Sequence, residues 1–139
     1  MHADWTEFFG RRALDRYRPL WLIIEALLML IAVLFWISLG FGVSAFSPET
    51  WGSYACEWPA KMWGAAILIA TGMTTTGLIR PVTARRVAAG AALQAVVFFA
   101  LSISASFTGG QFVIGAYLSI LFVPMHLILA AQAVRYDPR

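Results

Sequence analysis

The sequence predicts an all-α fold: an integral membrane bundle of four helices with a short N-terminal amphipathic helix at the membrane interface. The 139 residues are 60% hydrophobic and only 12% charged, whereas soluble domains average about a quarter charged residues. The apolar residues also fall into four long blocks, each about as long as the ~20 residues that a helix needs to cross a bilayer. Finally, the arginines alternate with these blocks in the manner of a multi-pass membrane protein.

The four blocks are predicted to be helices because backbone groups in hydrocarbon must be paired within their own segment. Their expected limits are about 20–46, 59–79, 86–107 and 112–134. Residues 19–139 would then form one four-span domain, preceded by a cytoplasmic segment over residues 1–18. Ser47, Pro48 and Glu49 read as the cap and first turn of a further short helix over 48–55.

The segment before the first span has the pattern of an interfacial helix. Asp4 and Glu7 resemble a capping box, and aromatic residues recur at helical spacing with arginines on the other flank. We expect this segment to lie flat in the cytoplasmic interface, beside anionic lipid. The first span itself is too long for the apolar region of a signal peptide, so we expect an uncleaved anchor.

The basic residues predict the orientation. Nine of the ten lie before the first span, between the second and third, or after the fourth, and only Lys61 lies on the other side. Positive charge is retained on the cytoplasmic side. We therefore expect a protein of the bacterial inner membrane with both termini in the cytoplasm. Topology accounts for the net charge of +3, and no nucleic-acid partner is needed to explain it.

Each span carries polar residues in its cytoplasmic half. At 1.5 Å per residue, Glu25, Gln94 and His126 lie roughly 8–13 Å from that face, and the run Thr74–Thr76 lies in the same half of the second span. We expect an inner polar layer with Glu25, Thr75, Gln94 and His126 as its representatives.

Two interpretations of this layer stay open. In the structural one, Glu25 is neutral or bonded to His126 or Gln94, and the layer fixes the register of the helices. In the functional one, Glu25 and His126 form a proton relay or a cation site, because an ionisable residue within a span is a candidate functional site.

Pro124 should kink the fourth span next to His126, which raises the question of a haem or quinone. A membrane b-type haem takes two axial histidines, and the only other histidine is the distant His2. We therefore expect no cofactor and no metal site.

Small residues predict close helix packing. Three pairs are spaced four apart, as in small-xxx-small motifs: Ala66 with Ala70, Ala88 with Ala92, and Ala91 with Ala95. Four spans cannot use all these faces internally, so a homo-oligomer or other membrane subunits are expected as partners besides the lipid bilayer. Tryptophans at both interfaces fit an aromatic belt, namely Trp5, Trp51, Trp58 and Trp63. The single Cys56 forms no disulfide within the chain.

The chain contains no phosphate loop, Gly-x-Ser-x-Gly, His-Glu-x-x-His or dinucleotide motif, so we expect no enzyme. The run from Phe46 to Gly52, followed by Pro59, Ala60 and Trp63, resembles small multi-span membrane proteins encoded by tailed phages. That resemblance implies a holin-like role, a non-enzymatic one based on self-association or on docking in a membrane assembly. The alternatives are a small transporter or proton-conducting subunit using Glu25 and His126, and the membrane anchor of a redox complex.

Overall fold

The computed structural model describes residues 8–40, 57–79, 81–107 and 114–137, and side chains in 8–33, 62–79, 81–103 and 120–137. Within these ranges the chain contains four long α-helices and no strand: α2 (Ala13–Gly40), α4 (Glu57–Leu78), α5 (Ala84–Phe107) and α6 (Ile114–Val134). The prediction of an all-α fold with four long helices is confirmed. The helix predicted over 48–55 lies outside the described residues, as do residues 1–7 of the segment 1–18.

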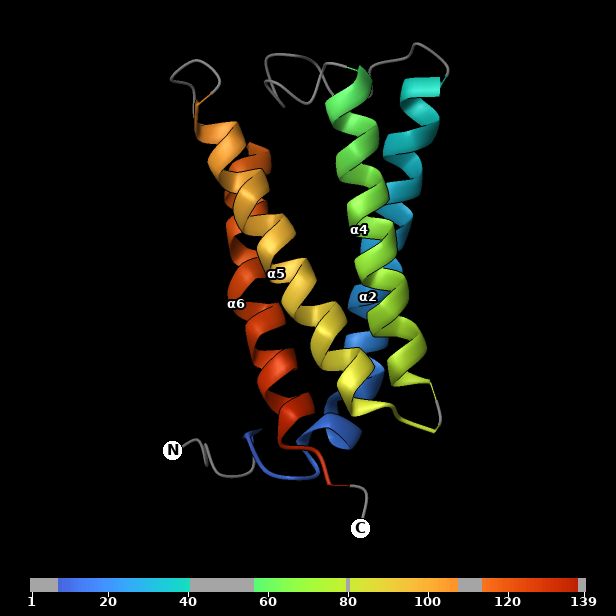
Figure 1. Ribbon diagram of the computed structural model, residues 1–139, viewed down its shortest axis with the longest axis vertical. Helices are drawn as coiled ribbons and strands as arrows, with labels where there is room; N and C mark the ends of the chain where they lie inside the picture. The colour runs from blue at the N-terminus through green and yellow to red at the C-terminus, as the bar shows by residue number, and fades with distance from the viewer. Residues whose placement is uncertain (1–7, 41–56, 80, 108–113, 138–139) are drawn as a thin grey trace.

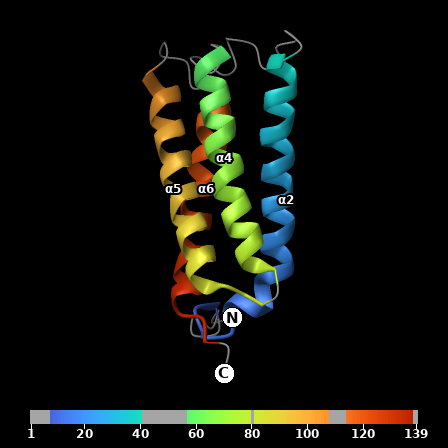
Figure 2. The same cartoon turned by 45° about the vertical axis from the view of Figure 1, so that its right-hand side comes forward.

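The helices form an elongated bundle with successive helices antiparallel (Figure 1). Side by side in sequence order, α2 packs on α4, α4 on α5 and α5 on α6, whereas α2 and α6 have little direct contact. Turning the molecule shows the same four-helix column (Figure 2). At one end α2 begins, α4 turns into α5 and α6 ends, and we call this end the foot of the bundle.

The first helix begins earlier than the predicted start of the first span. It starts at Ala13 and passes through Pro19, although a proline inside a helix lacks the N–H that would bond the fourth preceding carbonyl. The first turns of α2, in blue, lie obliquely at the foot before the helix rises (Figure 1). Residues 13–18 are therefore continuous with the first long helix and do not form a separate element.

The turn between α4 and α5 is tight. The Thr83 N–H donates to the carbonyl of Gly77 at 2.9 Å, and the Thr83 carbonyl accepts from the backbone N–H groups of Arg86 and Val87. A Cβ on Gly77 would lie 2.8 Å from the backbone nitrogen of Val87, so only glycine permits this approach. An apolar core fills the foot above the turn, made of Leu14, Trp21, Leu78, Val87, Ala91, Leu129 and Ala133.

One described helical stretch, Ala84–Ile103 in α5, is long and apolar enough by itself to cross a membrane. The apolar stretches Met62–Leu78 of α4 and Ile120–Val134 of α6 are shorter when only the described residues are considered.

Candidate functional site

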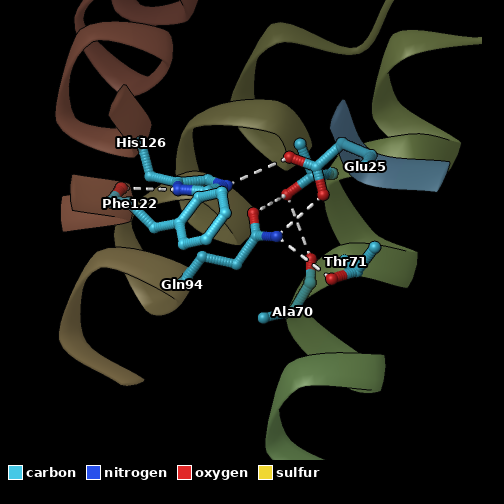
Figure 3. Close-up of polar contacts among 7 residues, drawn as sticks. Glu25, Ala70, Thr71, Gln94, Phe122 and His126 are labelled. Carbon is cyan, nitrogen blue, oxygen red and sulfur yellow. Dashed lines mark hydrogen bonds and ion pairs between the residues drawn. The ribbon is translucent and has the colours of Figure 1, made fainter. Parts of the chain in front are cut away.

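A polar network lies at the centre of the bundle, with a contribution from every helix. Its members are Glu25 of α2, Thr71 and Thr74 of α4, Gln94 of α5 and His126 of α6. All five side chains are fully buried. Figure 3 shows Glu25, Thr71, Gln94 and His126 pointing toward one another from the four helices. An acid, an amide and an imidazole thus meet in the interior of an otherwise apolar bundle.

Gln94 joins three of the four helices. Its Nε2 donates to Glu25 Oε2 at 2.7 Å and to Thr71 Oγ1 at 3.1 Å. Its Oε1 accepts from the Thr74 hydroxyl at 2.9 Å. The same hydroxyl lies 3.0 Å from the carbonyl oxygen of Ala70. Because a hydroxyl has only one hydrogen, Thr74 divides it between these two acceptors.

The proximity of Gln94 to α4 depends on Gly90, one turn earlier on the same face of α5. A Cβ on Gly90 would lie 2.7 Å from the backbone nitrogen of Thr74 and 3.1 Å from the carbonyl oxygen of Ala70, and would collide with the Thr74 hydroxyl. Backbone atoms cannot move aside as a flexible side chain can. The absence of a side chain at this position therefore sets the distance between α4 and α5.

His126 completes the network from α6. Its Nδ1 lies 2.7 Å from the carbonyl oxygen of Phe122, and its Nε2 lies 3.3 Å from Glu25 Oε1. A carbonyl oxygen can only accept, so Nδ1 carries a hydrogen. The Nε2–Oε1 contact then contains one further proton, carried either by the imidazole or by the carboxyl group. With one proton in this contact, the Glu25–His126 pair would be neutral overall.

The network is closed at both ends. Away from the foot, the ring of Phe98 stacks on that of Phe122 with their centroids 5.0 Å apart, and Phe98 also lies 5.6 Å from the imidazole of His126. Toward the foot lies the apolar core that contains Trp21 and Leu129. Water is therefore kept from the carboxyl group, and the network can satisfy its polar atoms only internally.

Three of the four residues predicted for the inner layer meet in this network: Glu25, Gln94 and His126. The structure places Thr75 outside it, because the Thr75 hydroxyl oxygen is buried without a hydrogen-bond partner. Thr74 bonds Gln94 instead, and Thr71 was not predicted at all. The signal for Thr71 was available in its spacing, since residues three apart share one helix face.

The six alanines predicted to pack helices differ in burial. Ala70, Ala91 and Ala95 are buried within the chain, Ala66 and Ala88 are half-buried, and Ala92 is exposed. The pair of Ala91 with Ala95 therefore serves the bundle itself.

The predicted belt of tryptophans is only partly described. Trp63 is half-buried, Trp58 lies in the first turn of α4, and Trp5 and Trp51 lie outside the described residues.

A second buried polar contact lies at the foot and was not predicted. Trp21 Nε1 donates to Gln132 Oε1 at 3.0 Å, and Gln132 Nε2 donates to the carbonyl oxygen of Phe8 at 3.1 Å. Tyr136 donates its hydroxyl to Asp15 at 3.2 Å nearby. These contacts join the segment before α2 to the end of α6. Gln132, a polar residue in an apolar run, was the available signal.

The surroundings of His126 do not favour a haem ligand. Both of its ring nitrogens already have partners within the chain. No cluster of three or more histidine, cysteine, aspartate or glutamate residues suited to a metal ion occurs in the described part of the chain. α6 continues through Pro124, and the kink expected there stays a prediction.

Comparison of the chain with protein-family models, with curated proteins and with solved structures finds no match. Any proposal about function therefore rests on the geometry of the chain itself.

Proposed function

We propose that the chain is a non-enzymatic, multi-pass subunit of the bacterial inner membrane. The observation that carries this proposal is the distribution of side chains. The polar network is fully buried, whereas large apolar residues are exposed on all four helices. The exposed apolar residues include Ile23, Leu27 and Leu30 on α2, Ile69 on α4, Val96 and Phe99 on α5, and Leu121 and Leu127 on α6. Soluble monomers seldom expose large apolar side chains in such number, and a lipid bilayer is the natural solvent for them.

The lengths of the helices support four spans. α2 has 28 residues, α4 has 22, α5 has 24 and α6 has 21. At 1.5 Å per residue even the shortest is ~31 Å long, which matches a hydrocarbon core of ~30 Å. In α2 the charged residues Asp15, Arg16 and Arg18 lie in the oblique first turns at the foot, at the position of the headgroups in this arrangement.

The described arginines support the proposed orientation because they lie at the foot: in or just before the first turns of α2, at the start of α5 and just after α6. By the positive-inside rule the foot faces the cytoplasm. Reporter fusions test this topology. A fusion at Arg139 should report cytoplasm and one near Gly52 should report periplasm. An external C-terminus would overturn the four-span arrangement.

We propose that the subunit acts through association in the bilayer, with other copies or other membrane subunits, and that a holin-like role is its specific form. Of the predicted small pairs, Ala88 with Ala92 is the one that the bundle leaves partly available, since Ala92 is exposed. The run from Phe46 to Gly52 that carries the phage resemblance lies outside the described residues. Expression of the chain in a bacterium should depolarise or lyse the cells if the role is holin-like, and unchanged growth and membrane potential would remove that role.

A second candidate function rests on the Glu25–His126 contact, namely a small transporter or proton-conducting subunit. A buried acid and histidine that share a proton are the parts that such a subunit needs. Flux measured in proteoliposomes separates the two candidates. Glu25→Gln should abolish a proton or cation flux with the fold intact. Full flux in that variant would remove the transport function, and the network would then serve only to hold the helices.

A further inference from the structure

We infer that the polar network is a proton-binding site with two states, in which the uptake of one proton is coupled to a 180° rotation of the Gln94 side-chain amide. The inference concerns what the site binds, not whether the chain conducts protons or self-associates. It therefore stands or falls independently of both proposed functions.

The first state is the one that the structure shows. In this state Glu25 Oε2 accepts from Gln94 at 2.7 Å and carries no hydrogen. The shared proton lies between Glu25 Oε1 and His126 Nε2. This state is neutral, but its hydrogen bonds are not all complete, because the single hydroxyl hydrogen of Thr74 faces both Gln94 Oε1 and the carbonyl oxygen of Ala70.

The second state follows from exchanging the two ends of the amide. Amide oxygen and nitrogen have nearly the same shape, so their hydrogen-bond partners determine the orientation. After the rotation, Gln94 Nε2 donates to Thr74 Oγ1, and the Thr74 hydroxyl donates to Ala70 alone. Gln94 Oε1 now faces two oxygens, Thr71 Oγ1 and Glu25 Oε2. The Thr71 hydroxyl can donate to it. The hydroxyl hydrogens of Thr74 and Thr71 then have one acceptor each, while Gln94 Nε2 exchanges its two acceptors, Glu25 Oε2 and Thr71 Oγ1, for Thr74 Oγ1.

This rotation requires a proton. Two bare oxygens cannot face each other at the 2.7 Å that now separates Gln94 Nε2 from Glu25 Oε2, so Oε2 must be protonated and donate to the amide oxygen. Glu25 Oε1 then becomes a carbonyl oxygen, and His126 Nε2 must carry a hydrogen to face it. The rotated state thus holds a carboxylic acid and an imidazolium, one proton more than the first state. The proton comes from hydronium, which leaves as water, and no electrons move.

No other ionisable group competes at this site. Over residues 62–78, where the side chains of α4 are described, this helix has no titratable side chain. On α5 the only ones are Arg85 and Arg86 near the foot, roughly 12 Å from Gln94 at 1.5 Å per residue. The next charged residue after His126 is Arg135, just after the end of α6, and on α2 the nearest to Glu25 is Arg18. A net charge is costly inside an apolar interior, so the neutral state is the ground state and acid populates the rotated one.

The test uses the full chain in detergent micelles, with nitrogen-15 in its histidine and glutamine side chains. On acidification the ring nitrogens of His126 and the side-chain NH₂ of Gln94 should shift together with one midpoint. Gln132 is the internal control. It is also fully buried, but its partners are Trp21 and a backbone carbonyl, which do not titrate in this range. Its NH₂ should not follow the same transition.

Two variants make the result decisive. Glu25→Gln can still accept from Gln94 and donate to His126, but it cannot take up the proton, so the shift of the Gln94 NH₂ should disappear and the chain should bind one proton fewer. Thr75→Val, which removes a buried hydroxyl outside the network, should leave the shift intact. Titration of His126 with the Gln94 NH₂ unmoved would overturn the inference. So would the same shift produced by Na⁺ at constant pH, which would assign the site to a metal cation, or the absence of any titration before the protein unfolds.

Discussion

Replacing Gly90 by alanine tests whether the close approach of α4 and α5 holds the polar network together. The new Cβ would lie 2.7 Å from the backbone nitrogen of Thr74. Ordinary van der Waals contact begins at 3.4 Å, so the two helices must separate by about 0.7 Å at this level. A uniform separation of that size would lengthen the 2.9 Å and 3.1 Å bonds from Gln94 to α4 beyond the range of good hydrogen bonds.

The magnitude follows from three contributions. Overpacking costs about 1–3 kcal/mol. Two interhelical hydrogen bonds contribute roughly 0.6 kcal/mol each in membrane proteins. The higher helix propensity of alanine offsets these losses by about 1 kcal/mol. The net expectation is a loss of about 1–3 kcal/mol in the free energy of unfolding. It can be measured by titrating the detergent-solubilised protein with a denaturing detergent and following tryptophan fluorescence.

Gly72→Ala is the matched control because it makes the same change in the neighbouring helix α4. A Cβ on Gly72 meets nothing within 4 Å, so this variant should keep the gain in helix propensity and be as stable as the wild type or more so. If Gly90→Ala were equally stable, the bundle would not be limited by close packing at Gly90, and the reasoning that derives the position of Gln94 from that glycine would be refuted.

Three further predictions use the same unfolding measurement. Glu25→Leu removes the Glu25 oxygens that Gln94 and His126 contact and should cost about 1–2 kcal/mol, whereas Glu25→Gln should be nearly as stable as the wild type. Equal losses would mean that shape alone matters. Trp21→Phe keeps an aromatic ring but removes the donor to Gln132, at a cost of about 1–2 kcal/mol; no loss would mean that this bond is replaced by water. Ala95→Leu should cost about 1–3 kcal/mol by overpacking. Ala92 is exposed, so Ala92→Leu should change the stability by no more than about 0.5 kcal/mol. If copies associate through the face that contains Ala92, this variant should also lower the mass of the solubilised protein.

The existence of the four long helices could be predicted because long apolar runs leave few other folds. The residues at which the helices begin and end were harder to predict. The predicted first span began at Leu20, after the proline, but α2 begins at Ala13. A proline disfavours the helix that precedes it, yet this local preference is overridden here. Leu14 is fully buried in the apolar core at the foot, and the contact from Tyr136 to Asp15 joins the same turns to the end of α6.

The depth of the polar residues could also be predicted, because the rise per residue of a helix is fixed. This is why Glu25, Gln94 and His126 were expected at one level. The depth of a residue along a helix does not say on which face of the helix its side chain lies, however. Successive residues of a helix are rotated by about 100°, and Thr74 and Thr75 lie at nearly the same level. Only the packing at Gly90 selects Thr74, because it presses that turn of α4 against α5.

At the foot, Gln132 could be recognised in the sequence as a candidate polar contact, but its partners could not be derived. Gln132 is one polar residue near the end of an apolar helix, and its partners are Trp21 and the backbone of Phe8, more than a hundred residues away. A backbone carbonyl carries no sequence signal, and the position of Phe8 depends on how the chain returns beneath the bundle. Such contacts are set by the tertiary arrangement and become visible only with it.

The polar network also explains why an acid is tolerated in the apolar run of α2. A buried carboxylate without partners would be prohibitively costly. At Glu25, one oxygen accepts from the Gln94 amide and the other lies 3.3 Å from His126 Nε2, so both oxygens have a partner inside the bundle. The structural and functional interpretations of this layer are therefore compatible. The contacts that join the helices at this level include the one between Glu25 and His126. A change of protonation in that contact would reach α4 through Gln94, which bonds both Glu25 and the two threonines of α4.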